Sequence, residues 1–164
     1  MAGISPESVE DREFLIQALR TSKAKDNPSI LVLIAGLKAQ NGQYQAALDT
    51  INQALRKRPK VTGYILMKAN LLSALGNEEE TAAWYAKSSR KHKNNFEVRL
   101  AEAKYLVKKN EATQTLSKLE AILKKWPDED ETLFLAGLTS IDLKQYEKAE
   151  KYLVELRYSA QYQN

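Results

Sequence analysis

Four residues that suit a sharp turn recur along the chain at a constant spacing of 34 residues: Gly42, Gly76, Asn110 and Lys144. Each lies between two helix-forming segments, and glycine and asparagine are the residues that most readily end a helix in a left-handed conformation. A fixed period of this length is typical of helical-repeat proteins, in which every repeat is one supersecondary unit. The spacing therefore predicts about four similar units rather than one irregular fold.

Small residues recur at the same spacing on both sides of these turns. The column before the turn holds Ala35, Ala69, Ala103 and Gly137, and the column after it holds Ala47, Thr81, Thr115 and Ala149. Small side chains are needed where two helices cross closely, because a larger side chain would hold the helix axes apart. The pattern predicts a pair of closely packed helices in each unit. An alternative register places Gly36 instead of Ala35 at the first crossing.

Apolar residues between these columns follow a helical period, as Tyr44, Leu48, Ile51 and Leu55 do. We therefore expect antiparallel helix pairs over residues 28–41 and 44–57, 61–75 and 78–91, 96–109 and 112–126, and 130–143 and 146–159.

One more helix is expected near residues 6–22, with Ser5 as its N-cap and Pro6 in its first turn. Its expected apolar side consists of Val9, Leu15, Ala18 and Leu19. We interpret this helix as the second helix of an earlier repeat or as a cap over an open end.

Two stretches carry a specific resemblance to a known family. "LIAGLKAQNGQYQAALDTINQALRKRP" and "LFLAGLTSIDLKQYEKAEKYLVELR" have small residues at the helix crossing, a turn residue, a tyrosine soon after it and a later alanine. The unit resembles the tetratricopeptide repeat in these features, whereas the two middle units match it less well. The resemblance implies an all-α, right-handed α-solenoid with a cap or partial repeat over residues 1–27 and an array over 28–164. The array divides into units 28–61, 62–95, 96–129 and 130–164.

The same resemblance implies a protein or peptide partner bound on the concave side, which the first helix of each pair lines. Adjacent exposed apolar side chains of this kind usually mark an interaction site. Some of them could instead belong to the core between helices. The residues expected in this groove are Val32, Leu33, Leu66, Met67, Asn70, Leu100, Lys104, Val107, Phe134, Leu135, Leu138 and Ile141.

Clusters of basic residues also recur at the 34-residue spacing, at the ends of the second helices. They are Arg56, Lys57 and Arg58, then Arg90 and Lys91, then Lys124 and Lys125. One interpretation is a basic edge that binds an anionic surface. The other is that these cations complement the negative ends of helices on a solvated edge. Few aromatic residues lie near them, which argues against nucleic acid as the partner.

The chain offers little for catalysis or for a metal or cofactor. It has no cysteine, a single histidine at His92, and no phosphate-binding glycine motif. The acidic runs Asp128–Glu131 and Glu78–Glu80 fall where helices are expected to begin, and carboxylates there complement the positive helix end. The sequence therefore predicts a non-enzymatic protein without a cofactor.

The remaining alternatives concern assembly and compartment. The chain could be a structural or self-associating segment of a longer array. No apolar run approaches the roughly 18 residues of a membrane span, and no signal peptide is recognised at the N-terminus. The compartment stays open between the cytoplasm and, as part of a longer exported protein, the periplasm. The repeats resemble those of bacterial proteins of envelope assembly or secretion.

Overall fold

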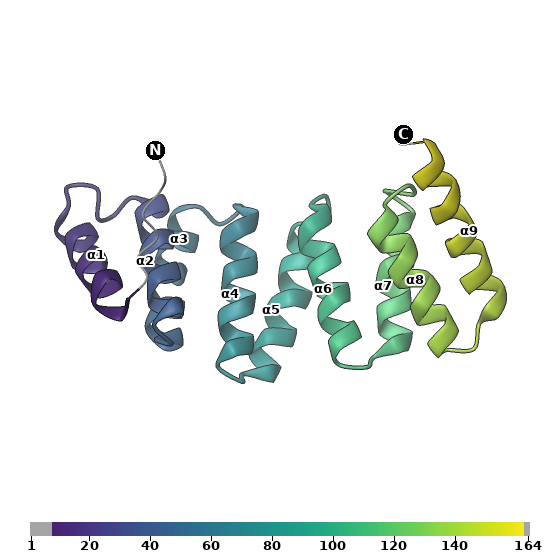
Figure 1. The fold of residues 1–164 in the computed structure, drawn as a ribbon, viewed down its shortest axis with the longest axis horizontal. Helices are drawn as coiled ribbons and strands as arrows, with labels where there is room; N and C mark the ends of the chain where they lie inside the picture. Colours follow the sequence, from purple (N-terminus) through teal and green to yellow (C-terminus); the bar gives the residue numbers. More distant parts are fainter. Residues whose placement is uncertain (1–7, 163–164) are drawn as a thin grey trace. The chain divides into compact units, whose positions relative to one another are not determined.

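The computed structural model describes the backbone of residues 8–162 and the side chains as far as Tyr158. All regular secondary structure in this described range is α-helical (Figure 1). The helices are α1 (Val9–Thr21), α2 (Pro28–Gln40), α3 (Tyr44–Lys57), α4 (Thr62–Ala74), α5 (Glu78–Lys91), α6 (Phe96–Lys108), α7 (Ala112–Leu123), α8 (Asp130–Asp142) and α9 (Tyr146–Tyr162). The all-α fold class and the alternation of first and second helices are as predicted.

The chain divides by its contacts into two compact units, and the boundary falls inside α5, between Trp84 and Tyr85. We refer to the part before the boundary as unit 1 and the part after it as unit 2. In unit 1, α2 packs against both α1 and α3, and α3 packs against α4. In unit 2, α7 packs against both α6 and α8, and α8 packs against α9. Each of these helices thus packs on a neighbour in sequence, as expected for stacked helix pairs.

All four predicted turns adopt the same backbone geometry. The φ angles of Gly42, Gly76, Asn110 and Lys144 are 73°, 72°, 58° and 58°. In each turn the N–H of the left-handed residue donates to the carbonyl of the residue three positions before it, at 2.8 to 3.0 Å. The N–H of the following residue donates to the carbonyl five positions before itself, at 2.8 to 3.1 Å. This is the Schellman arrangement, which satisfies the last carbonyls of a helix. The predicted turn positions are therefore confirmed.

The predicted crossing positions are also buried. Ala35, Ala69 and Ala103 are each 0% exposed, and Gly137 is buried in α8. A Cβ atom built on Gly137 would lie 2.7 Å from Leu153 Cδ2, whereas one on Gly36 would meet nothing closer than Met67 Cε at 3.8 Å. The register with Ala35 at the crossing is therefore correct, and the alternative with Gly36 is wrong.

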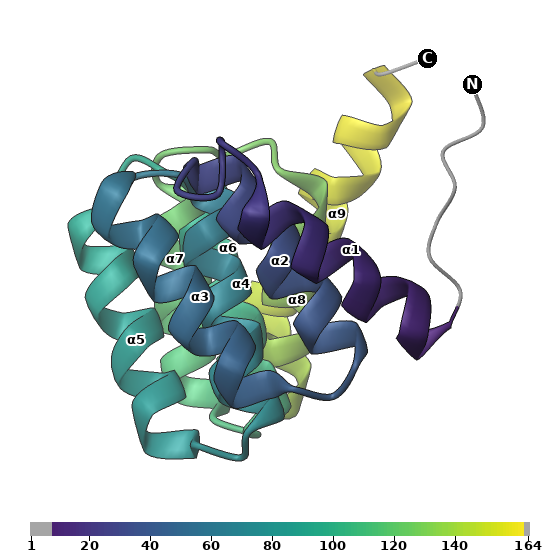
Figure 2. The same cartoon turned by 90° about the vertical axis from the view of Figure 1, so that its left-hand side faces the viewer.

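The leading helix lies beside α2 (Figure 2). It packs there through Ile16, which forms a cluster with Ile34 and Leu37. The predicted apolar side of this helix is partly wrong, because Val9 and Ala18 are exposed. A helix that covers only one neighbour buries a narrow stripe, and here that stripe is centred on Ile16.

The start of the leading helix also differs from the prediction. The helix begins at Val9, and its N-cap is Ser8, whose Oγ accepts a hydrogen bond from Asp11 N at 3.0 Å. The predicted cap residues Ser5 and Pro6 lie outside the described residues.

The core of unit 2 is built around Leu116, Leu119 and Ile122 of α7. Leu100 belongs to this cluster and is only 6% exposed. Its predicted place on a binding surface is therefore wrong: the side chain points to α7 instead of solvent.

The end of α7 at Leu123 is three residues short of the predicted 126, because the chain turns there and places Trp126 edge-on against Phe96. α9 extends to Tyr162, beyond the predicted residue 159.

Candidate functional site

Exposed apolar side chains gather on one helix of unit 2. Phe134, Leu138 and Ile141 of α8 are 46%, 42% and 44% exposed. Their spacing of four and then three residues puts them on one face of the helix, which we call the α8 apolar face. Val107 of α6 adds another exposed apolar side chain in the same unit, at 38%. Leu135, also predicted for this surface, is half-buried against the core of unit 2.

Lys104 of α6, one of the predicted groove residues, already has a partner within unit 2. Its Nζ lies 2.5 Å from Glu131 Oε1 in the first turn of α8, and both side chains are about half exposed. An ion pair this exposed contributes little to stability. It does show that the exposed sides of α6 and α8 are neighbours and that charge is available there.

The predicted groove residues of unit 1 are less exposed. Leu33 is 46% exposed and Asn70 is exposed, but Val32, Leu66 and Met67 are half-buried. Half-burial on a first helix means that these side chains also fill the packing between helices. Unit 1 therefore presents less apolar surface at the predicted positions than unit 2 does.

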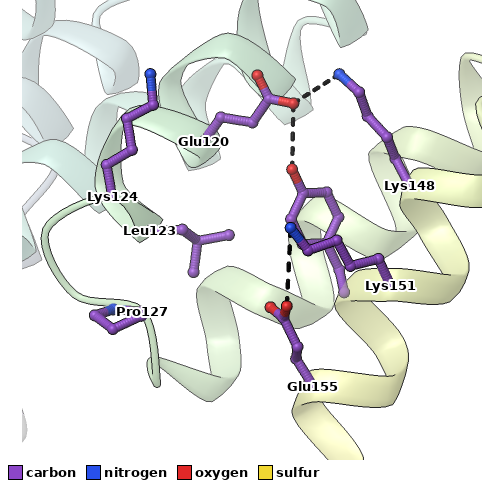
Figure 3. A pocket seen from close by; sticks show the side chains of 8 residues that line it. Glu120, Leu123, Lys124, Pro127, Lys148, Lys151 and Glu155 are labelled. Atoms are coloured by element: carbon purple, nitrogen blue, oxygen red, sulfur yellow. Dashed lines mark hydrogen bonds and ion pairs between the residues drawn. The ribbon is translucent and has the colours of Figure 1, made fainter.

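A pocket of about 500 Å³ lies in unit 2 between α7 and α9 (Figure 3). Glu120 of α7 faces α9 across it, and its Oε1 accepts hydrogen bonds from Lys148 Nζ at 2.8 Å and from Tyr152 OH at 3.2 Å. The hydrogen bond from Lys148 lowers the pKa of Glu120. Burial, together with the nearby Glu120 charge, raises the pKa of Tyr152 to about 12. The pocket thus contains a carboxylate that is held ionised by side chains of the chain itself.

A smaller pocket of about 160 Å³ lies in unit 1. Its lining comes from α1, the loop after it, α2 and α3: Arg20, Lys25, Asp26, Leu31, Ile34, Lys38, Thr50 and Gln53. Lys38 is only 8% exposed. Its Nζ donates to Thr50 Oγ1 at 2.8 Å and to the Ala46 carbonyl at 3.2 Å. Burial, and next the Arg20 charge, lower the pKa of Lys38.

Sequence reasoning missed this unit 1 pocket, although a signal for it existed. The residues at 34-residue spacings from Lys38 are Leu72, Leu106 and Ser140. A lysine in a column of apolar and small residues is unusual, because a buried ammonium group is costly unless it has partners. The pocket itself could not be foreseen, since its lining comes from four separate segments.

The predicted basic clusters are all exposed. Arg56 and Lys57 lie in the last turn of α3, Arg90 and Lys91 lie in the last turn of α5, and Arg58, Lys124 and Lys125 follow their helices directly. In unit 2, Lys125 Nζ lies 2.5 Å from Asn94 Oδ1, which joins the loop after α7 to the loop after α5. The clusters of unit 2 therefore lie at the same end of that unit.

The acidic runs sit where they were expected, at the beginnings of helices. Glu78–Glu80 form the first turn of α5, and Asp130 and Glu131 lie in the first turn of α8. Among the described residues, no group of three or more metal-binding side chains comes together. None of the helices described is both long enough and apolar enough to cross a bilayer.

Comparison with known proteins agrees with this geometry. Residues 130–156, which span most of α8 and α9, match the family model of the tetratricopeptide repeat. The chain is 32% identical over 125 residues to lipopolysaccharide assembly protein B of Haemophilus influenzae, covering 76% of the chain and 31% of that relative. It is 31% identical over 101 residues to the human N-alpha-acetyltransferase 16, NatA auxiliary subunit, covering 57% of the chain and 12% of that relative. The chain thus spans less than a third of either relative.

Solved structures show the same fold. A MamA double mutant superposes with a TM-score of 0.72 at 16% identity, over 98% of this chain and 88% of that one. MamA from Desulfovibrio magneticus gives 0.71 at 14% identity, over 94% and 86%. YrrB, described as a tetratricopeptide-repeat protein with an unusual peptide-binding site, gives 0.64 at 18% identity, over 92% and 76%.

The helix pairs and their identical turns define an α-helical repeat protein. Residues 130–156 match the tetratricopeptide repeat, and the chain has the same fold as the solved tetratricopeptide-repeat structure of YrrB.

Proposed function

We propose that the chain is a non-catalytic interaction module that binds an apolar segment of another protein on the α8 apolar face. The observation that carries the proposal is the exposure of Phe134, Leu138 and Ile141, each above 40%, on a single side of α8. Solvent-exposed apolar side chains grouped in this way are costly to leave in water, and they commonly mark a binding surface. The tetratricopeptide-repeat fold supports the proposal, since stacked helix pairs offer extended surfaces for partner chains.

The spacing along α8 also indicates the form of the partner. Residues at i, i+4 and i+7 make a straight apolar strip, which an amphipathic helix or an extended peptide with spaced apolar side chains can cover. The Lys104–Glu131 pair borders α8 near its first turn. It provides one charge of each sign, so polar residues beside the apolar ones of the partner would find complementary groups.

Selection from a library of displayed peptides tests this function, with affinities then measured for purified variants. Phe134→Glu and Leu138→Glu should each weaken binding of the selected peptides at least about tenfold, because each puts a charge into a desolvated contact. Phe14→Glu is the matched control, since Phe14 is 79% exposed on α1 of unit 1 and is not part of the α8 apolar face. It should change the affinity less than about twofold.

Circular dichroism must show equal helicity for all three variants. If the control weakened binding as much as Phe134→Glu, or if no peptide bound the wild type, the proposed function would be wrong. A loss of helicity confined to the α8 variants would show that these residues are part of the core.

The place of this interaction in the cell is a further part of the proposal. The likeness to a lipopolysaccharide assembly protein supports a partner in bacterial envelope assembly. Photo-cross-linking from position 138 in the cells that make the protein, followed by mass spectrometry, tests this expectation. A cross-linked envelope-assembly protein would support it, and a partner from another process would contradict it.

A further inference from the structure

The lining of the unit 1 pocket carries more positive charge than negative charge. Arg20, Lys25 and Lys38 line it together with only one carboxylate, Asp26. Within the described part of the chain, none of the three cations forms an ion pair. Asp49 and Glu13 act on Lys38 only through space, and they oppose the effect of Arg20. An excess of cations around a small concave site attracts and holds an anion.

The buried ammonium group of Lys38 also has bonding capacity to spare. A lysine carries three N–H donors, and Lys38 uses two of them on the neutral oxygens of Thr50 and Ala46. Neutral acceptors satisfy hydrogen bonds but leave the charge uncompensated, which is unfavourable for a group that is 8% exposed. A ligand oxygen in the pocket would supply both the third hydrogen bond and the missing negative charge.

Unit 2 provides an internal comparison. Its pocket between α7 and α9 shares three repeat positions with the unit 1 pocket. The unit 1 pocket is lined there by Lys25, Thr50 and Gln53, and three 34-residue spacings later the unit 2 pocket is lined by Pro127, Tyr152 and Glu155. In unit 2, Glu120 supplies the anion and accepts from Lys148 and Tyr152 (Figure 3). The residue at the position of Glu120 in unit 1 is Ala18. Unit 1 therefore has three cations in its pocket lining but no carboxylate at the position of Glu120, and Asp26 is the one carboxylate of that lining.

From this juxtaposition we infer that the unit 1 pocket binds a phosphate group. Its cations come from three different segments: Arg20 from the last turn of α1, Lys25 from the following loop and Lys38 from α2. A tetrahedral dianion with several acceptor oxygens can engage three such donors, whereas a carboxylate has only two oxygens and one charge. A volume of about 160 Å³ admits one phosphate group with a few waters, because one water needs only about 10–15 Å³ of volume measured in this way.

Titration of the full chain with inorganic phosphate and with glycerol 3-phosphate, followed by NMR at constant ionic strength, tests the site. Both probes should bind saturably and shift the signals of residues around Lys38. Arg20→Gln and Lys38→Met should each weaken binding at least about tenfold. The controls Arg56→Gln and Lys57→Gln, which remove exposed cations of α3 outside the pocket lining, should change it less than about twofold.

The outcomes separate the sources of the phosphate group. Tighter binding of inorganic phosphate would identify the free ion as the ligand, and tighter binding of the ester would identify a phosphomonoester such as a headgroup. Equal shifts with acetate or chloride would overturn the inference, as would unchanged affinity in Arg20→Gln. Arg20 is exposed, so its variant remains informative even if Lys38→Met disturbs folding. The inference does not depend on the α8 apolar face, and Phe134→Glu should leave phosphate binding unchanged.

Discussion

At the scale of single residues, one backbone geometry is met by three different residue types. Gly42 and Gly76 adopt left-handed φ angles at no steric cost, whereas Asn110 and Lys144 adopt φ of 58° with a Cβ atom present. A left-handed conformation costs most L-residues about 1–2 kcal/mol, and asparagine less than most. The surrounding hydrogen bonds, which are the same in all four turns, hold Lys144 in this conformation.

Lys144→Gly should therefore raise the free energy of unfolding by about 0.5–1 kcal/mol. Relief of the left-handed strain exceeds the entropy that the more flexible glycine adds to the unfolded chain. Urea denaturation of the purified protein measures the change. Lys144→Ala is the control, because it removes the side-chain charge and keeps the Cβ atom, and it should leave stability nearly unchanged. A Lys144→Gly variant less stable than the wild type would contradict the prediction.

At the scale of helices, the same two repeat positions form a contact between the paired helices in two successive repeats, but the contact is of a different chemical kind in each. In unit 1, Lys68 of α4 lies 4.3 Å from the ring centroid of Trp84 in α5, a cation–π contact. Thirty-four residues later, Glu102 of α6 is 2.7 Å from Lys118 of α7, an ion pair. Glu102 is only 4% exposed, so this pair is partly desolvated. The repeat thus preserves the place of a cross-helix contact while its charge pattern changes.

α8 and α9 approach each other closely at Gly137, and this close approach leads to a prediction about the helix pair. Gly137→Ala should destabilise the protein by about 1 kcal/mol, because the new Cβ atom would lie 2.7 Å from Leu153 Cδ2 and overpacking costs about 1–3 kcal/mol. The middle of that range, about 2 kcal/mol, exceeds by about 1 kcal/mol the roughly 1 kcal/mol that alanine gains over glycine within a helix. Thermal or urea unfolding measures the difference.

Two comparisons identify the cause. Gly63→Ala in α4, where no atom lies within 4 Å of the added Cβ, should be neutral or stabilising. In a Leu153→Ala background, Gly137→Ala should lose its penalty, because the clashing atoms are absent. A penalty that persisted in this background would mean that the close approach to Leu153 is not its cause.

At the scale of the whole molecule, the chain divides into two compact units. The boundary lies inside α5, so this helix contributes residues to both units. In repeat proteins stability is the sum of local terms and nearest-neighbour interfaces, and parts of the chain can open separately. The two units should therefore differ in their response to a local loss of packing.

Leu119→Ala should speed amide hydrogen exchange in α6–α9 while α1–α3 keep most of their protection. Leu119 is 0% exposed in the core of unit 2, and removing such a side chain costs about 2–5 kcal/mol. Ile51→Ala, at the equally buried position in unit 1, should give the reverse pattern. Exchange followed by mass spectrometry resolves both. Equal loss of protection in all helices would show that the chain opens as one cooperative body.

Much of this protein follows from its sequence alone. The 34-residue period located the turns at Gly42, Gly76, Asn110 and Lys144, and the small-residue columns located the helix crossings. These features are local: a helix, its end and its turn depend on residues within a few positions of one another. The clearest local error was the end of α7, where Trp126 leaves the helix to pack against Phe96.

Side-chain exposure and the pockets were decided only by the tertiary structure. Leu100 and Phe134 are 34 residues apart and hold the same position on their first helices, yet Leu100 is 6% exposed in the core cluster of unit 2 and Phe134 is 46% exposed. The exposure of a repeat position therefore depends on the side chains that surround it in the folded unit. The charged pocket around Lys38 required Arg20, Lys25 and Lys38 to meet from separate segments. A periodic sequence determines which repeats are built. The packing around each repeat determines which side chains remain available to bind.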